Sequence, residues 1–243
     1  MAFKHGKATS VYLNATDLST YLNAADFDVD MDTGDTTTFA ATWKTAIAGQ
    51  VAAKAGFQGL YDPTITDLPA SVGVDFGSVL TYAPAGALAI GDRARLLSVA
   101  TTAYSESSPV GGVVAVKWSV MASGPVGFGD VLHVLGEDTN TTTGATKDDS
   151  AASATGWIAH LHVTAVDAGS WVIKLEDASA SNFSDGADVT GGSFTAATAA
   201  TYQRLVSATT TTALRRYVRY VATRTGGSAG DGITFALAYS RNS

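Results

Sequence analysis

The chain has 243 residues, of which 46% are hydrophobic and 15% charged, with a formal net charge of −7 and no cysteine. The absence of cysteine excludes disulfides, thiolate metal sites and cysteine nucleophiles. The net negative charge argues against binding of nucleic acid through its phosphates. No apolar run approaches the ~18 residues of a membrane span, and the first residues carry cations without an apolar segment, so we expect no membrane and no secretory signal.

The first half of the chain is predicted to consist of strands separated by Gly, Pro and polar clusters. The patterns indicate strands over residues 9–13, 25–32, 50–61, 79–82, 93–99 and 113–121. Residues 39–56 are ambiguous, because Ala-rich 42–48 is compatible with the start of a helix, whereas the glycines at 49 and 56 each weaken a helix by about 1 kcal/mol. A turn is expected at 124–129.

The strand predicted at 25–32 alternates acidic and apolar residues one for one. Its aspartates share one face and its large apolar residues the other, namely Asp26, Asp28, Asp30 and Asp32 against Phe27, Val29 and Met31. An EF-hand calcium loop needs Gly at its sixth position and Glu at its twelfth, and neither register that starts on these aspartates supplies them. We interpret the segment as a strand with one buried, apolar face and one acidic, solvated face, whose like charges discourage unwanted edge pairing; a calcium site of another kind stays open.

Residues 137–155 are polar, rich in small side chains and without periodicity, which predicts a long loop or linker. Beyond them, alternation indicates strands over residues 157–165, 171–175, 203–207, 215–223 and 233–240, with a strand or short turn at 194–201. Short spacings and the lack of a sustained helical period predict an all-β protein, a β-barrel or β-sandwich, with an N-terminal domain at 1–136 and a second sandwich lobe at 156–243.

Candidate catalytic and metal-binding residues are few. His160 and His162 share one strand face at a spacing that can chelate zinc or copper, with only His133 or Asp167 able to fold back as a third ligand. We prefer to interpret the pair as half-exposed histidines on a polar face. Nucleophile elbows and phosphate-binding glycine loops are absent, although two carboxylates suited to glycoside hydrolysis need only spatial proximity. We expect no enzymatic activity, no cofactor and no metal.

Basic residues concentrate around one aromatic side chain, in the order Arg215, Arg216, Tyr217 and Arg219. Alternation puts Arg215, Tyr217 and Arg219 on one strand face. Arg and Tyr are enriched at protein interfaces. We therefore predict that this cluster lies in a subunit interface, where its arginines pair with the acidic strand of a neighbouring copy.

Several short motifs, taken in order, carry a resemblance to a known family. They are Lys7-x-x-x-Val-Tyr-Leu-Asn14, Asp17-Leu-Ser19, Asp32-Thr-Gly-Asp-Thr-Thr-Thr-Phe39, Phe57-Gln-Gly-Leu-Tyr-Asp62, Gly156-Trp-Ile-Ala-His-Leu-His-Val163, Gly192-Ser-Phe-Thr195, Arg215-Arg-Tyr-Val-Arg219 and Thr234-Phe-Ala-Leu-Ala-Tyr-Ser-Arg241. Together they resemble the major tail (tail tube) proteins of long-tailed, siphovirus-like bacteriophages, and the motifs extend over most of the chain.

The resemblance implies a structural virion subunit that self-assembles into hexameric rings, which stack into a tail tube through which DNA passes without specific binding. It implies contacts with other copies, with tail terminator, tape measure and tail-tip proteins, and a location in the virion tail after assembly in the host cytoplasm. The acidic residues Asp26, Asp28, Asp30, Asp32 and Asp35 would line the lumen or belong to a stacking loop.

Two other functions stay open. One is an accessory virion β-sandwich that binds capsid or host glycans, with Trp157 and Trp171 as stacking platforms. The other is a stand-alone hydrolase.

Overall fold

The computed structural model describes residues 6–39, 42–63, 77–207 and 213–241. Apart from one short 3-10 turn, η1 (Gly6–Ala8), the regular structure of these residues is entirely β, which confirms the predicted all-β class. None of these residues lies in a helix long and apolar enough to cross a membrane. The strands are β1 (Ser10–Leu13), β2 (Thr16–Asp17), β3 (Leu22–Asp35), β4 (Ala46–Leu60), β5 (Ser78–Ala83), β6 (Arg93–Ser107), β7 (Ala115–Ala122), β8 (Gly127–Asp138), β9 (Thr142–Thr143), β10 (Lys147–Asp148), β11 (Trp157–Val166), β12 (Ser170–Ala178), β13 (Ala187–Ser193), β14 (Thr201–Val206), β15 (Tyr217–Thr225) and β16 (Ile233–Arg241).

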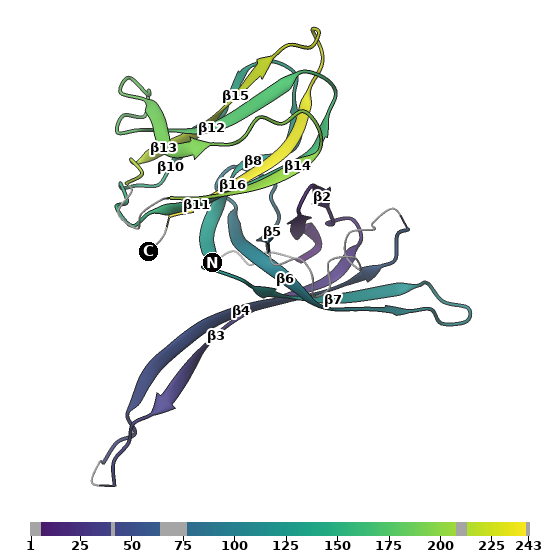
Figure 1. Ribbon diagram of the computed structural model, residues 1–243, viewed down its shortest axis with the longest axis vertical. Helices are drawn as coiled ribbons and strands as arrows, with labels where there is room; N and C mark the ends of the chain where they lie inside the picture. Colours follow the sequence, from purple (N-terminus) through teal and green to yellow (C-terminus); the bar gives the residue numbers. More distant parts are fainter. Residues whose placement is uncertain (1–5, 40–41, 64–76, 208–212, 242–243) are drawn as a thin grey trace. The chain divides into compact units, whose positions relative to one another are not determined.

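The chain forms two compact units that interleave along the sequence (Figure 1). The first unit combines Met1–Thr20, Ser78–Ser98 and Pro125–Ser243, and the second combines Tyr21–Gly77 and Val99–Gly124. Strand β6 begins in the first unit and ends in the second. The sequence predicted domain boundaries at 136 and 156, which divide the chain differently from these two units. That these boundaries delimit separately folding domains stays a prediction.

The first unit contains two antiparallel sheets that share one core. Its larger sheet runs β14-β11-β16-β8-β6-β5-β1-β2, and its smaller sheet runs β10-β15-β12-β13, with β9 also pairing β15. Fully buried side chains from both sheets meet in one cluster, among them Trp157, Leu161, Trp171, Leu175 and Phe235. Because strand side chains alternate between faces, the apolar positions predicted at 157–163 and 171–175 enter this core. Ala165, the last apolar position predicted for the first of these strands, is exposed instead, beyond a register shift between Val163 and Ala165.

Strand β8 replaces much of the turn that was expected at 124–129. The glycines in Gly127-Phe-Gly129 suggested a turn, but both lie in the strand. A Cβ on Gly129 would collide with the carbonyl oxygen of Tyr239, and a Cβ on Gly127 with the hydroxyl of Ser240. Glycine is therefore needed here because the backbone of β8 passes very close to β16. From the sequence alone, a glycine needed for close backbone approach looks the same as a glycine needed for a turn.

The segment expected as a loop at 137–155 is polar but not structureless. It begins with the end of β8 and contains the two-residue strands β9 and β10, which both pair with β15. Thr143 lies opposite Val221, and Lys147 lies opposite Val218. These short pairings were missed because two residues carry no detectable alternation.

The second unit is built on an antiparallel sheet in the order β3-β4-β7 followed by the end of β6. On one face, Phe57 stacks on Trp118 with ring centroids 4.5 Å apart, and Ala55 and Val120 are buried beside them. Strand β4 begins at Ala46 and residues 42–45 are not helical, so the helix considered at 42–48 is wrong. Residues 40–41 of the ambiguous segment 39–56 lie outside the described residues.

Candidate assembly interface

Strands β3 and β4 continue as a two-stranded ribbon beyond the rest of their sheet (Figure 1). The last pair between β4 and β7 is Lys54 with Met121, and Lys54 also pairs with Asp28 of β3. We call residues 29–35 and 46–53 the arm. At ~3.4 Å per residue, the arm extends about 24 Å past that pair. An isolated two-stranded ribbon is at best marginally stable in water, so this length calls for support from another surface.

One face of the arm is apolar and exposed. Val29 lies opposite Ala53 and Met31 opposite Val51, so these side chains share a face. Val29 is 39% exposed, Met31 51% and Val51 65%. The sequence predicted a covered apolar face, and the structure corrects this for the arm: its own chain leaves these side chains open. Contiguous exposed apolar surface of this kind is typical of an interaction site.

The opposite face of β3 is acidic, as the alternation predicted. The Lys54 ammonium lies 3.1 Å from Oδ2 of Asp28 and 3.1 Å from Oδ2 of Asp30, and hydrogen bonds to Asp30 and then Asp28 raise its pKa. All three groups are exposed, so the pairs contribute little to stability. Within the described residues, Asp26 and Asp32 form no ion pair. The face therefore keeps an excess of negative charge.

Asp35, at the end of β3, has a local structural use. Its carboxylate accepts a hydrogen bond of 2.8 Å from the backbone N–H of Thr37. Hydrogen bonds from the side chain and backbone of Thr37 lower the Asp35 pKa. Asp35 thus organises the turn that leaves the arm.

The outer edge of β3 has no partner strand in the part of the chain that the structure describes. Among the described residues, β3 pairs only with β4 along its whole length. An unpaired edge presents rows of N–H and C=O groups to which another strand can add. In the first unit, by contrast, the outer strand β2 has only two residues and so presents a very short edge.

The predicted arginine cluster is engaged within its own chain. Arg216 Nη2 lies 2.7 Å from Asp148 Oδ2, and Arg219 Nη2 lies 2.8 Å from Glu176 Oε2. Arg215 Nη2 lies 2.7 Å from Asp177 Oδ1. Arg216 also stacks over the Tyr217 ring, 4.9 Å from its centroid. The predicted pairing of this cluster with the acidic strand of another copy stays a prediction, and such pairing has to replace contacts that already exist.

His160 and His162 are buried, not half-exposed as predicted, and they share one hydroxyl. His162 Nδ1 donates to the Asn14 carbonyl at 2.6 Å, so its Nε2 accepts from the Thr81 hydroxyl at 2.7 Å. The same oxygen accepts from His160 Nδ1 at 3.1 Å, and His160 Nε2 accepts from Arg204 Nε at 3.2 Å. Burial lowers the pKa of His162 to about 4 and that of His160 well below its usual value.

This chain of hydrogen bonds satisfies two neutral imidazoles and leaves them no free nitrogen for a metal. No group of three metal-binding side chains occurs in the part of the chain that the structure describes. The histidines therefore hold β1, β5, β11 and β14 together in the first unit.

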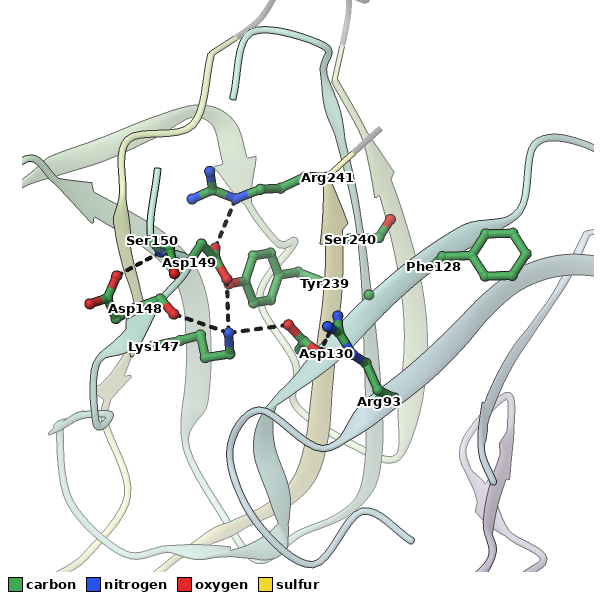
Figure 2. Close-up of a pocket in the computed structure, with 11 residues that line it drawn as sticks. Arg93, Phe128, Asp130, Lys147, Asp148, Asp149, Ser150, Tyr239, Ser240 and Arg241 are labelled. Carbon is green, nitrogen blue, oxygen red and sulfur yellow. Dashed lines mark hydrogen bonds and ion pairs between the residues drawn. The ribbon is translucent and has the colours of Figure 1, made fainter. Parts of the chain in front are cut away.

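A polar pocket of about 300 Å³ lies in the first unit (Figure 2). Lys147 Nζ stands between Asp149 Oδ1 at 2.9 Å and Asp130 Oδ2 at 3.2 Å. Burial acts to lower the Lys147 pKa, but its bonds to Asp149 and Asp130 outweigh burial and raise it. Arg93 and Arg241 pair with the same two carboxylates, at 3.1 Å and 2.8 Å. Each carboxylate is held by two cations, so the network joins β6, β8, β16 and the segment around β10.

Both tryptophans proposed as glycan platforms are in the core. Trp157 and Trp171 are each 0% exposed, so neither ring can stack on a sugar. Sequence alternation alone did not show which face of their strands would be covered.

No family model matches the chain, and no curated protein does. A solved structure described as the virion of a native gene transfer agent particle matches with 14% identity and a TM-score of 0.43, covering 52% of this chain and 98% of its own. The SPP1 tail tube matches with 10% identity and a TM-score of 0.41, covering 50% of this chain and 77% of its own.

A third match covers nearly the whole chain. It is the SPP1 Dit protein, described as part of the hub adsorption apparatus in phages that infect Gram-positive bacteria, with 12% identity and a TM-score of 0.34 over 96% of this chain and 98% of its own. These three similar structures thus come from a gene transfer agent virion, a tail tube and a phage hub apparatus. Likeness at this level assigns no function by itself.

Proposed function

We propose that the chain is a structural, non-enzymatic tail subunit that assembles with copies of itself into rings, six to a ring, stacked as a tube around passing DNA. The observation that carries the proposal is that β3, within the described residues, pairs with a strand on one side only and continues into an arm with an exposed apolar face. A monomer that kept both features in water would be prone to associate. The motifs that resemble tail tube proteins support the same conclusion.

Strand directions in the second unit suit closure into a ring. Each of β3, β4, β7 and β6 is antiparallel to the next, so β3 and β6 run in opposite directions. Rotation about a ring axis preserves strand direction, so β3 of one copy beside the end of β6 of the next continues the antiparallel order. Such a contact joins two different surfaces, and repeated rotation closes it. The number of copies, six, comes from the resemblance alone.

The acidic face of β3 suits a surface past which DNA moves. Asp26 and Asp32 carry no cation partner among the described residues, and one lysine serves both Asp28 and Asp30. A face with excess negative charge repels a polyanion and prevents it from sticking. In this proposal the acidic face lines the bore, and tail terminator, tape measure and tail-tip proteins contact the tube at its ends and interior. The complete tube belongs to the virion tail, after assembly in the host cytoplasm.

Hydrogen exchange with a built-in control tests the proposal. Light scattering over a concentration series would first establish assembly, and amide exchange would then be compared between monomer and assembly. We expect the outward N–H groups of β3 to become protected on assembly, because they gain strand partners. Strand β12 is already paired on both sides, with β13 and β15, and serves as the unchanged reference. Assembly without new protection in β3 would contradict the proposal.

The accessory glycan-binding alternative has no structural observation in its favour. Its two candidate platforms are buried. Glycan binding by a chain that stays monomeric at every concentration would support this alternative.

A further inference from the structure

Two buried side-chain atoms in the lining of the polar pocket have hydrogen bonds left unmade (Figure 2). Within the described residues, Asp130 Oδ1 accepts no hydrogen bond and Arg241 Nε donates none. Asp130 Oδ1 lies 3.1 Å from Arg93 Nη1, and Arg241 Nε lies 2.8 Å from a carboxylate oxygen, but neither contact has the direction of a hydrogen bond. Buried polar atoms normally have partners, so this acceptor and this donor call for a group that serves both.

The pocket also carries an excess of positive charge. Its ion-pair network combines three cations with two carboxylates. The remaining carboxylate of the lining, Asp148, is neutralised by Arg216, whose Nε and Nη2 each lie 2.7 Å from one of its oxygens. The side chain of Arg93 is 72% exposed, and within the described residues its guanidinium has one ion pair, through Nη1. Its other N–H groups can hold an anion in a forked contact.

An exposed aromatic ring lies beside these charges. Phe128 lines the same pocket and is 53% exposed. It is two residues from Asp130 on β8, so both side chains point to the same face of the sheet. The guanidinium carbon of Arg95 lies 4.8 Å from the centroid of the ring. An apolar group that enters the pocket together with an anion can therefore pack on Phe128.

We propose that this pocket binds the C-terminal carboxylate of a partner polypeptide whose last residue is apolar. The carboxylate accepts hydrogen bonds from Arg93 and Arg241, and the last backbone N–H donates to Asp130. The last side chain packs on Phe128. This site goes beyond the proposed tube and does not depend on it.

Three properties of the pocket select the end of a chain. Asp130 Oδ1 and Arg93 Nη1 are 3.1 Å apart, so the donor and the acceptor of the ligand have to be neighbours, like the N–H and carboxylate that a terminal residue carries on one carbon. A single negative charge offsets the positive excess, whereas a free amino acid also brings an ammonium group. A volume of about 300 Å³ is at the small end of ligand sites and suits a chain end better than a continuous segment.

Isothermal titration calorimetry with short synthetic peptides tests the nature of the ligand. The probes are acetyl-Ala-Ala-Leu as the free acid, the same peptide as its C-terminal amide, and the amide of acetyl-Leu-Glu-Ala, which has an internal carboxylate. The free acid should bind about tenfold more tightly than either amide, because only it offers a terminal carboxylate to the guanidinium. No binding of the free acid, or equally tight binding of either amide, would overturn the inference.

Variants at Arg93 test the place of binding. Arg93→Gln, at an exposed position, should weaken binding of the free acid about tenfold and remove its advantage over the amide. Arg93→Lys keeps the charge without the fork and should recover only part of that loss. Lys174→Gln is the matched control, because Lys174 belongs to the first unit, pairs with Asp188 at 2.6 Å and does not line the pocket. An equal loss in the control would overturn the site, because it would assign binding to overall charge.

Phe128→Thr tests the apolar part of the contact. The parent chain should prefer a free-acid peptide that ends in Leu to one that ends in Ala. The variant should lose this preference and still bind the peptide that ends in Ala, which also shows that it is folded. A preference for Leu that persists in the variant would overturn packing of the last residue on the ring.

Discussion

Acid should destabilise the first unit through His162, and the size of the effect follows from the buried network. His162 is 1% exposed, and its pKa falls to about 4 through burial, partly opposed by the hydrogen bond to the Asn14 carbonyl. The unfolded chain has an ordinary histidine pKa near 6.5 and so binds more protons than the folded chain between these values. The free energy of unfolding therefore rises with pH across this window.

The stability tied to the neutral imidazole is fully present above pH 6.5 and is lost as the pH falls through about 4. At about 1.4 kcal/mol for each pKa unit, His162 alone accounts for about 3 kcal/mol. His160 acts in the same direction, because burial and then the neighbouring His162 and Arg204 charges lower its pKa.

Urea unfolding at pH 7, 6, 5 and 4, followed by tryptophan fluorescence, measures this dependence. Carboxylates also titrate in this range, so the informative quantity is the difference between the parent chain and His162→Gln, which removes the ionisable group. The parent should lose about 3 kcal/mol more than the variant between pH 7 and pH 4. Parallel pH curves for the two proteins would refute the reasoning.

Three further predictions concern packing, ion pairs and the acidic face. Gly129→Ala should cost about 2 kcal/mol or more in unfolding free energy through its collision with β16, whereas Gly124→Ala, with nothing within 4 Å of its new Cβ, should change the thermal midpoint little. Arg219→Ala should cost about 1 kcal/mol in urea unfolding, because the half-buried ion pair with Glu176 is lost; no change would show that the pair is only a surface contact. Asp28→Asn combined with Asp30→Asn should leave tubes intact under the microscope and increase their retention of DNA in gel shift, while collapse of the tubes would assign these residues to subunit contacts.

The sequence predicted those features that a single strand carries in its own alternation. The acidic and apolar faces of β3 follow from a period of two, and so do the buried positions of β11. The same rule placed His160 and His162 correctly on one face but misjudged their burial. What covers that face is Thr81 of β5 and the Asn14 turn, both distant in sequence.

Features that depend on a second element could not be read from one strand. The arginine cluster was recognised, but its partners come from β10 and β12, and nothing local indicates them. Strand β8 was missed because its glycines serve close backbone approach, while turns use glycine for a different reason. The arm was underestimated because Thr- and Ala-rich residues beyond Asp32 carry no alternation, although they continue the ladder to Asp35 opposite Ala46.

Electron microscopy of the purified chain over a concentration series tests the central claim most directly. The open β3 edge and the exposed arm predict hollow rings that stack into tubes as concentration rises, with the acidic face of β3 towards the bore. Folded monomers at every concentration, with the same fluorescence and unfolding midpoint as at high dilution, would contradict it.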